Sequence, residues 1–215
     1  MKEQVRSPKS RRYRMSRRAD LVDQTRQRIT EAAVGLHTSI GPSATSMSAV
    51  ADEAGVTRLT LYRHFPSKDE LFGACMSHWR SLHPPPDPDR WRAIPAFEPR
   101  VRRALVDLYR WYAANGDDLY PIYRDAAYTP ASNQRARQAN NERMADAMLG
   151  DAGVGDSARR LRAAIGHVIG FWTWRSLVVD QGLATSDASA MAAEFVLAAG
   201  RPHGGPTGRS ASRSR

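Results

Sequence analysis

The chain has 215 residues, of which 41% are apolar and 25% charged. That is enough apolar material for one large domain or two small ones, and it excludes a chain that is disordered throughout. The net charge of +10 is concentrated at the ends: residues 1–30 carry ten basic and three acidic side chains, and residues 201–215 carry four basic and none acidic. Basic segments rich in Ser, Pro and Arg bury little apolar surface and attract polyanions. We therefore predict a flexible basic arm over residues 1–19 and a disordered basic tail over residues 201–215.

Three features indicate a cytoplasmic protein without a membrane partner. Cys75 is the single cysteine, so no intramolecular disulfide can form, which suits a reducing compartment. The N-terminal segment has positive charge but lacks the apolar region of a signal peptide. The most apolar stretch, AAIGHVIGFWTWRSLVV, is interrupted by His167 and Arg175 and is too short to span a bilayer.

The first predicted helix covers residues 20–40 and ends at Gly41-Pro42. His37 lies within this helix, and we interpret it as a satisfied core histidine, with a pH sensor as the alternative. Apolar residues recur at the spacing of one helical face, at Ile29, Ala32, Ala33, Leu36 and Ile40.

Two unusually short helices follow, over residues 47–54 and 58–64. Gly55 lies between them and supplies the positive φ that a tight helix-to-helix turn requires. Thr57 is the expected N-cap of the second short helix, and Leu61 is its expected buried anchor. Helices of about two turns are poorly stabilised on their own, so these two need another reason to exist.

The segment Ser67–Glu70 has the pattern of a capping box and begins the next helix. Its apolar stripe consists of Leu71, Phe72, Cys75, Met76 and Trp79, so Cys75 is interpreted as a small buried hydrophobe rather than a redox switch. His78 and His83 share no spacing with acidic or thiol partners. We therefore predict no metal site and no cofactor.

A proline-dense stretch over residues 83–99 is predicted to be a linker. Beyond it, helices are expected at residues 100–115, 119–127, 131–149, 156–182 and 186–199, and no strand is expected. Asp117-Asp118 would then lie in a turn after Gly116. The glycines of residues 150–155 indicate a turn rather than a phosphate loop, because no strand precedes them.

The segment 156–182 is apolar on more than one side, so a helix there must be covered all round. Gly166 and Gly170 permit close approach of another backbone. Together with the alanine-rich segment 186–199, this pattern predicts a homodimer through an intersubunit four-helix bundle.

Two short helices joined by a glycine turn, with polar residues opening the second, are typical of a helix-turn-helix. Its second helix is short because only its N-terminal end must enter the major groove of DNA. The segments TRQRITEAAVGLHTSIG, ATSMSAVADEAGVTRLTLYRHFPSKDELF and FWTWRSLVVDQGL resemble the TetR/AcrR family of tetracycline-repressor-like transcriptional regulators. The resemblance is specific over residues 20–80 and extends to the rest only in helical layout.

The resemblance implies an all-α fold: an N-terminal three-helix DNA-binding domain with a helix-turn-helix, including the linking helix, over residues 20–82, followed by a helical effector-binding and dimerisation domain over residues 100–200. It further implies a repressor that binds a palindromic operator as a dimer and is released by a small-molecule effector.

Residues 58–64 are then the recognition helix, with Arg58 as the expected reader of guanine. Leu59 and Thr60 are expected at a thymine methyl. The remaining predicted DNA contacts, mainly to phosphates, are Thr45, Ser46, Thr57, Tyr62, Arg63, His64 and Lys68, with Arg17 and Arg18 of the basic arm. The alternative is that Arg58 and Arg63 are ordinary solvated charges and that Tyr62 covers the edge of the core.

The aromatic residues of the second domain are candidates for an effector pocket, although aromatic stripes also form plain cores. His167 or Arg124 would orient a polar or anionic group. The predicted pocket residues are Trp111, Tyr123, Phe171, Trp172 and His167.

Two other functions compete with a ligand-released repressor. An all-α enzyme is disfavoured, because the chain has no G-x-S-x-G, no H-E-x-x-H and no Walker loop. A constitutive DNA-binding regulator without an effector fits the same composition.

Overall fold

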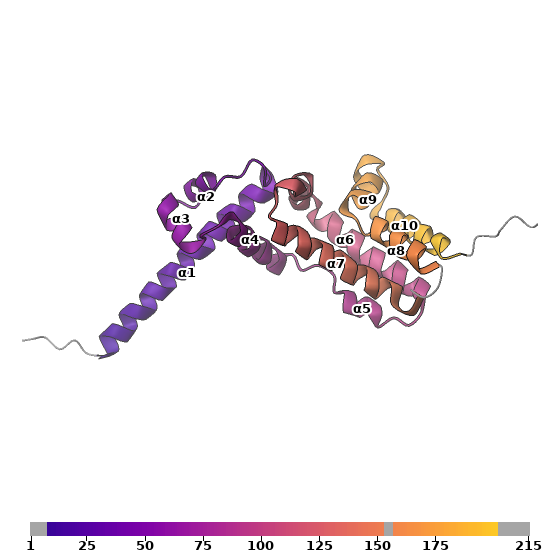
Figure 1. The fold of residues 1–215 in the computed structure, drawn as a ribbon, viewed down its shortest axis with the longest axis horizontal. Coiled ribbons are helices and arrows are strands. Elements are labelled where there is room, and N and C mark those ends of the chain that lie inside the picture. The colour runs from indigo at the N-terminus through magenta and orange to yellow at the C-terminus, as the bar shows by residue number, and fades with distance from the viewer. Residues whose placement is uncertain (1–7, 153–156, 202–215) are drawn as a thin grey trace, which may run out of the picture. The chain divides into compact units, whose positions relative to one another are not determined.

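The computed structural model describes residues 8–152 and 157–201, and every element in this part of the chain is a helix, as predicted. Within the same part, no helix is long and apolar enough to cross a membrane. Figure 1 labels the ten α-helices of this part. In chain order the elements are α1 (Pro8–Ser39), α2 (Met47–Glu53), α3 (Arg58–His64), α4 (Lys68–Leu82), α5 (Pro88–Arg92), α6 (Phe97–Arg124), η1 (Ala126–Tyr128), α7 (Ala131–Leu149), η2 (Gly150–Ala152), α8 (Ser157–Val168), α9 (Phe171–Arg175), η3 (Ser176–Asp180) and α10 (Thr185–Ala199).

The helices form two compact units. Among the described residues, the first unit contains 8–85 and Asn115–Gln138, and the second contains Pro86–Ala114, 139–152 and 157–201. This division differs from the predicted domain over residues 100–200, because it assigns Asn115–Gln138 to the first unit. Long-range hydrogen bonds hold this segment in the first unit: the Trp79 indole donates to Asp118 (2.9 Å) and the Ser132 hydroxyl donates to Asp69 (2.6 Å).

Helix α1 begins at Pro8, well before the predicted start near residue 20. No glycine or further proline occurs between residues 9 and 34, and proline is favoured at a first helical position. The predicted flexible arm over residues 1–19 is therefore helical from Pro8 onward. Residues 1–7 and the predicted tail over 202–215 lie outside the described residues.

The core of the first unit forms where α1 packs against α2 and α4. Ile29, Val50 and Leu61 are completely or almost completely buried there. The stripe predicted for α4 is buried at all five positions, which confirms its interpretation. Ile40, predicted on the buried face of the first helix, is instead 45% exposed, because α1 ends one residue earlier.

The proline-rich stretch of residues 83–99 is not a simple linker, because it contains α5. Pro88 occupies the first turn, and the Asp87 side chain accepts a hydrogen bond from the Asp89 amide as the cap. Trp91 is 1% exposed, and its indole donates to Asp107 of α6 at 3.1 Å. The buried tryptophan anchors this segment to the second unit.

Helix α6 is continuous where a break near Gly116 was predicted. Asp117 and Asp118 lie inside this helix rather than in a turn, so that prediction was wrong. A glycine inside a helix lowers its stability by about 1 kcal/mol relative to alanine. The packing of a long amphipathic helix offsets this loss.

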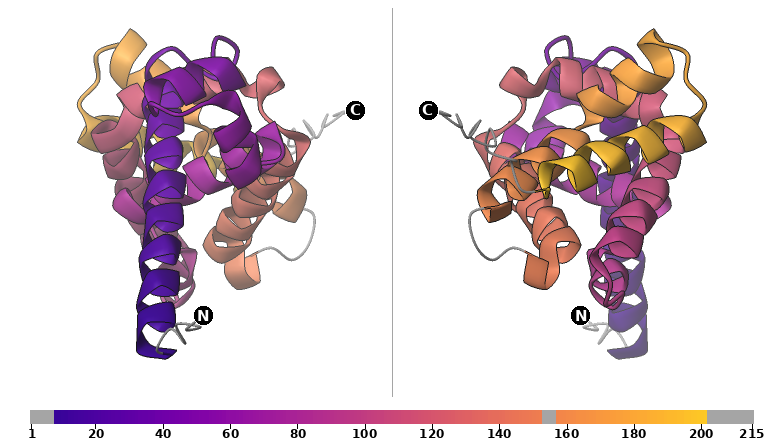
Figure 2. Two further views of the ribbon diagram at one scale, coloured as in Figure 1. Left: turned by 90° about the vertical axis from the view of Figure 1, so that its left-hand side faces the viewer. Right: turned by 90° about the vertical axis from the view of Figure 1, so that its right-hand side faces the viewer.

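The predicted helix over residues 156–182 is instead divided into α8, α9 and the π-helical turn η3. At the break, the Tyr109 hydroxyl donates to the Val168 carbonyl (3.0 Å) and the Tyr112 hydroxyl donates to the Ile169 carbonyl (2.9 Å). These bonds satisfy two carbonyls that a continuous helix would have used. Helices α8 and α10 pack side by side, in orange and yellow in Figure 2.

Candidate nucleic-acid interface

Helix α3 is positioned by caps and by one apolar anchor. Gly55 adopts φ +64° in the turn between α2 and α3, as predicted. The Thr57 side chain accepts the Thr60 amide at 3.2 Å, and Leu61 is the buried residue of α3, with no exposed surface. Seven residues held by one cap and one anchor leave the other side of α3 turned outward.

The outward side of α3 combines cationic and apolar side chains. Leu59 is 74% exposed and Tyr62 is 40% exposed, next to the exposed Arg58 and Arg63. Neither arginine forms an ion pair with another described residue. This side of α3 therefore presents positive charge and apolar surface together, which suits a polyanion with an apolar groove.

Helix starts hold four of the predicted phosphate contacts: Thr45 and Ser46 before α2, Thr57 before α3 and Lys68 in α4. Tyr62, Arg63 and His64 lie further along α3. Ser46 caps α2 by accepting the Ala49 amide (3.0 Å), and Lys68 opens α4 behind the cap Ser67. Ser46 and Lys68 line the same small cavity of about 50 Å³. Thr45 also lines this cavity; it is buried, and its hydroxyl donates to the Gly41 carbonyl (2.8 Å).

The end of α3 is held by a residue that sequence reasoning missed. The Arg26 guanidinium donates to the His64 carbonyl and lies 4.0 Å from the centre of the Phe65 ring. A cation near the last carbonyls of a helix is favoured by the helix dipole. Arg17 and Arg18, predicted on DNA, belong to α1, but their side chains lie outside the described residues.

A buried histidine–cysteine pair lies in the core of this unit. The Nδ1 atom of His37 is 3.4 Å from the Cys75 sulfur, and its ring packs on Phe72 with centroids 4.9 Å apart. Burial, and then the positive charge of Lys68, lower the pKa of His37 to about 4. Burial raises the pKa of the Cys75 thiol to about 12. Both residues are therefore neutral core residues near pH 7, as predicted.

A second missed cluster clamps the loop that enters α2. The Asp125 carboxylate accepts hydrogen bonds from the Ser43 amide (3.0 Å) and hydroxyl and from the Arg124 Nε (2.8 Å). Arg124 also donates to the Ile40 carbonyl (2.8 Å). The Arg124 bond, followed by the Ser43 bonds, holds the pKa of Asp125 far below its usual range. Arg124, predicted to orient an effector, is thus engaged in this clamp.

The structure brings the predicted effector residues together only in part: the Phe171 and Trp172 rings pack with centroids 5.5 Å apart, and Trp111 adjoins them through Tyr112. Trp111 and Tyr123 share α6 but belong to different units. Phe171 is 1% exposed and packs edge-on against Tyr112, with ring centroids 5.6 Å apart, as part of the core. Trp172 is 49% exposed, and the exposed His167 lies against Phe195.

No group of three or more His, Cys, Asp or Glu side chains suited to a metal ion occurs within residues 8–152 and 157–201.

The described fold and the outward side of α3 together define the class of all-helical proteins with an N-terminal helix-turn-helix. Residues 29–75 match the family model of the bacterial regulatory proteins of the tetR family. This segment therefore belongs to the tetR family.

Other proteins share this domain or this fold. The AcrR transcriptional regulator of Shigella flexneri is 45% identical over 49 residues, which span 23% of each chain. The match thus covers about a quarter of that relative's length. NalD of Pseudomonas aeruginosa, the secondary repressor of the MexAB-OprM multidrug efflux pump, aligns over 82% of this chain and 96% of its own, with a TM-score of 0.57 and 17% identity.

Two further solved structures show the same fold. PfmR of Thermus thermophilus, a TetR family regulator, covers 79% of this chain and 97% of its own, with a TM-score of 0.52 and 18% identity. A TetR-like regulator from a Rhodococcus species covers 80% and 93%, with a TM-score of 0.51 and 23% identity. At such identities the similarity establishes the TetR-type fold of the chain.

Proposed function

We propose that the protein is a transcriptional regulator, a repressor that binds an inverted-repeat DNA operator as a homodimer and releases it when a small-molecule effector binds. The observation that carries the proposal is the outward side of α3, where Leu59 is 74% exposed between two exposed arginines. A leucine exposed to this extent contributes little to the core, and here it lies among cationic side chains. It fits the apolar surface of a thymine methyl in the major groove.

The position of each residue indicates whether it contacts a base or a phosphate. Arg58 at the first turn of α3 reads guanine through a bidentate pair of hydrogen bonds, because the N-terminal end of a recognition helix enters the groove. Ser46 and Lys68, at the starts of α2 and α4, bind phosphates and orient the domain.

Replacement of Arg58 tests this assignment. The operator is first recovered by selecting bound duplexes from a random DNA pool, and we expect an inverted repeat. Arg58→Ala should then lower affinity by about 1 to 3 kcal/mol and relax specificity at one base pair of each half-site. Titrations of labelled duplexes carrying each single substitution measure both effects.

A matched variant makes that result interpretable. Lys68→Ala should weaken binding equally for all sequences and flatten the salt dependence by roughly 0.9 for each phosphate that the protein no longer neutralises. If Arg58→Ala also weakens all duplexes equally, Arg58 binds a phosphate rather than a base. A random pool that yields no enriched sequence contradicts the operator itself.

The second unit supports a dimer through α8 and α10. Met191 and Phe195 are 50% and 52% exposed on one side of α10, and Phe195 lies beside His167 of α8. Gly166 is exposed on α8, with open space around it. An apolar side without cover, next to a glycine that allows close approach, suits an isologous contact with a second copy.

Introducing a charge at this surface should separate the protomers. We expect sedimentation velocity to give a dimer for the unmodified chain and a monomer for Phe195→Glu, because a buried unpaired carboxylate is strongly disfavoured. Leu82→Glu is the control, since Leu82 is 63% exposed at the end of α4. A monomeric unmodified chain, even with operator DNA present, contradicts the dimer.

A further inference from the structure

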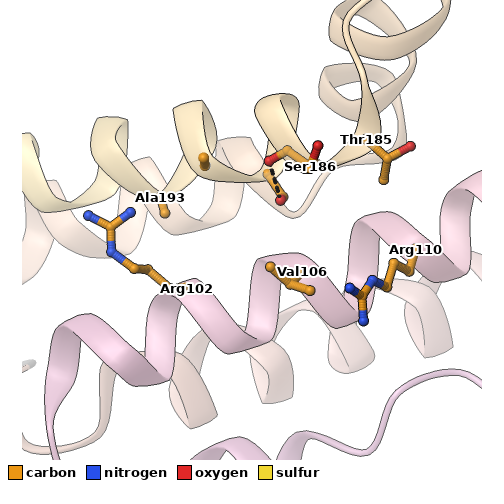
Figure 3. Close-up of a pocket in the computed structure, with 8 residues that line it drawn as sticks. Arg102, Val106, Arg110, Thr185, Ser186 and Ala193 are labelled. Atoms are coloured by element: carbon orange, nitrogen blue, oxygen red, sulfur yellow. Dashed lines mark hydrogen bonds between the residues drawn. The ribbon is translucent and has the colours of Figure 1, made fainter.

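The second unit contains a cavity of about 220 Å³ between α6 and α10. A cavity of this size suits a small compound. Figure 3 shows the two helices that form its walls. The residues that line it are Arg102, Val106, Arg110, Thr185, Ser186, Ser189, Ala190 and Ala193.

The α6 wall presents two arginines on one side of the helix. Arg102, Val106 and Arg110 are spaced at four-residue intervals, and Figure 3 shows Arg102 extending toward α10 while Arg110 lies along α6. Arg102 is partly neutralised, because its Nε donates to Glu98 at 2.8 Å. Arg110 has no ion-pair partner among the residues the structure describes. One guanidinium at this wall is thus uncompensated.

The α10 wall adds hydrogen-bond donors and an apolar surface. Thr185 and Ser186 line the cavity from the first turn of α10, where the Ser186 hydroxyl also donates weakly to the Asp187 carboxylate at 3.5 Å. The preceding residue, Ala184, provides no side-chain cap for the amides of that turn. Ala190 and Ala193 line the cavity further along α10, and with Val106 they form an apolar surface between the polar groups.

The cavity stays open in the proposed dimer. At about 100° per residue, the lining positions of α10 lie roughly opposite Met191 and Phe195 around the helix. The exposed apolar side of α10 can therefore contact a second copy while the cavity faces away from it.

We propose that this cavity binds a small organic anion, a compound with a compact apolar body and one carboxylate or phosphate group. The anionic group pairs with Arg110 and with the donors at the start of α10, and the apolar body lies against Val106, Ala190 and Ala193. A guanidinium is suited to this recognition because its planar donors match a carboxylate or phosphate. Such an anion would be the effector of the proposed function. Only the release of DNA on binding rests on that proposed function.

Calorimetric titration of the full-length protein tests the site without DNA. The probes are benzoate and phenyl phosphate, with benzamide as the uncharged analogue of benzoate. We expect saturable binding of at least one anion and none of benzamide. Arg110→Gln should weaken anion binding about tenfold, the effect of losing one charge-assisted hydrogen bond. Arg135→Gln removes the same charge from an exposed position of α7 outside the cavity and should change nothing.

Three results would overturn the site: no saturable heat with either anion, equal binding of benzamide, or equal weakening by Arg110→Gln and Arg135→Gln. Circular dichroism of both variants establishes that each is folded. Because the titration contains no DNA, a failure of operator binding leaves its result intact. Conversely, if the protein binds its operator normally but no anion binds in the cavity, the proposed anion site is wrong and the proposed regulator function still stands.

Discussion

Acidification from pH 7 to 4 is expected to destabilise the N-terminal unit by about 3 kcal/mol through His37 alone. Burial lowers the pKa of His37 in the folded protein to about 4 from the ordinary value of 6.5. The unfolded chain therefore binds the proton first, so the stabilisation is complete above pH 6.5, falls as the pH decreases toward 4, and is lost below that. Urea unfolding at a series of pH values measures the free energy of unfolding. Amide hydrogen exchange in α2 and α4 then shows whether the loss lies in the N-terminal unit.

A substitution separates His37 from the other groups that titrate in acid. His37→Phe keeps an aromatic ring against Phe72 and has no proton to gain, so the decline between pH 6.5 and 4 should become shallower. His78→Gln, at a half-buried position of α4, is the control and should retain the decline. An identical pH profile for His37→Phe and the unmodified protein contradicts the assignment to His37.

Replacing Gly41 with alanine is expected to destabilise the same unit by about 2 to 4 kcal/mol. Gly41 has φ +92°, a region that other residues rarely adopt, and a Cβ atom there would collide with an Asp125 carboxylate oxygen. The substitution therefore strains the backbone and also pushes Asp125 away from Ser43. Chemical denaturation measures the loss.

Two other glycines separate these contributions. Gly55 has φ +64° but open space around it, so Gly55→Ala should show the backbone cost alone, about 1 to 2 kcal/mol. Gly35 lies inside α1 with no neighbour within 4 Å, so Gly35→Ala should stabilise by about 0.5 to 1 kcal/mol. If Gly41→Ala lowers the free energy of unfolding no more than Gly55→Ala does, the hydrogen bonds between Asp125 and Ser43 contribute nothing to stability.

The helix-turn-helix could be predicted closely from local signals. The bounds of α3, its cap Thr57 and its anchor Leu61 agree with the structure. These features depend on neighbours within about four residues, such as a cap hydroxyl and the amide three residues later. The five buried positions of α4 were predicted for the same reason, because helical periodicity is written in the sequence itself.

Long-range hydrogen bonds could not be predicted. Arg26 holds the end of α3 from 38 residues away, and Asp125 holds the loop before α2 from 82 residues away. In sequence, Arg26 is one of many exposed arginines, and Asp125 follows an arginine near a helix end. No local pattern distinguishes either from a solvated charge.

The sequence by itself determined the helical class, the short helices with their caps, and the residues that α3 turns outward, because each depends on contacts close along the chain. Only the tertiary structure decided that α6 continues through Gly116, that Trp91 anchors the proline-rich stretch, and that a cavity opens between Arg110 and the start of α10. The physical reason is that packing between segments far apart in sequence can outweigh a local preference of about 1 kcal/mol per residue.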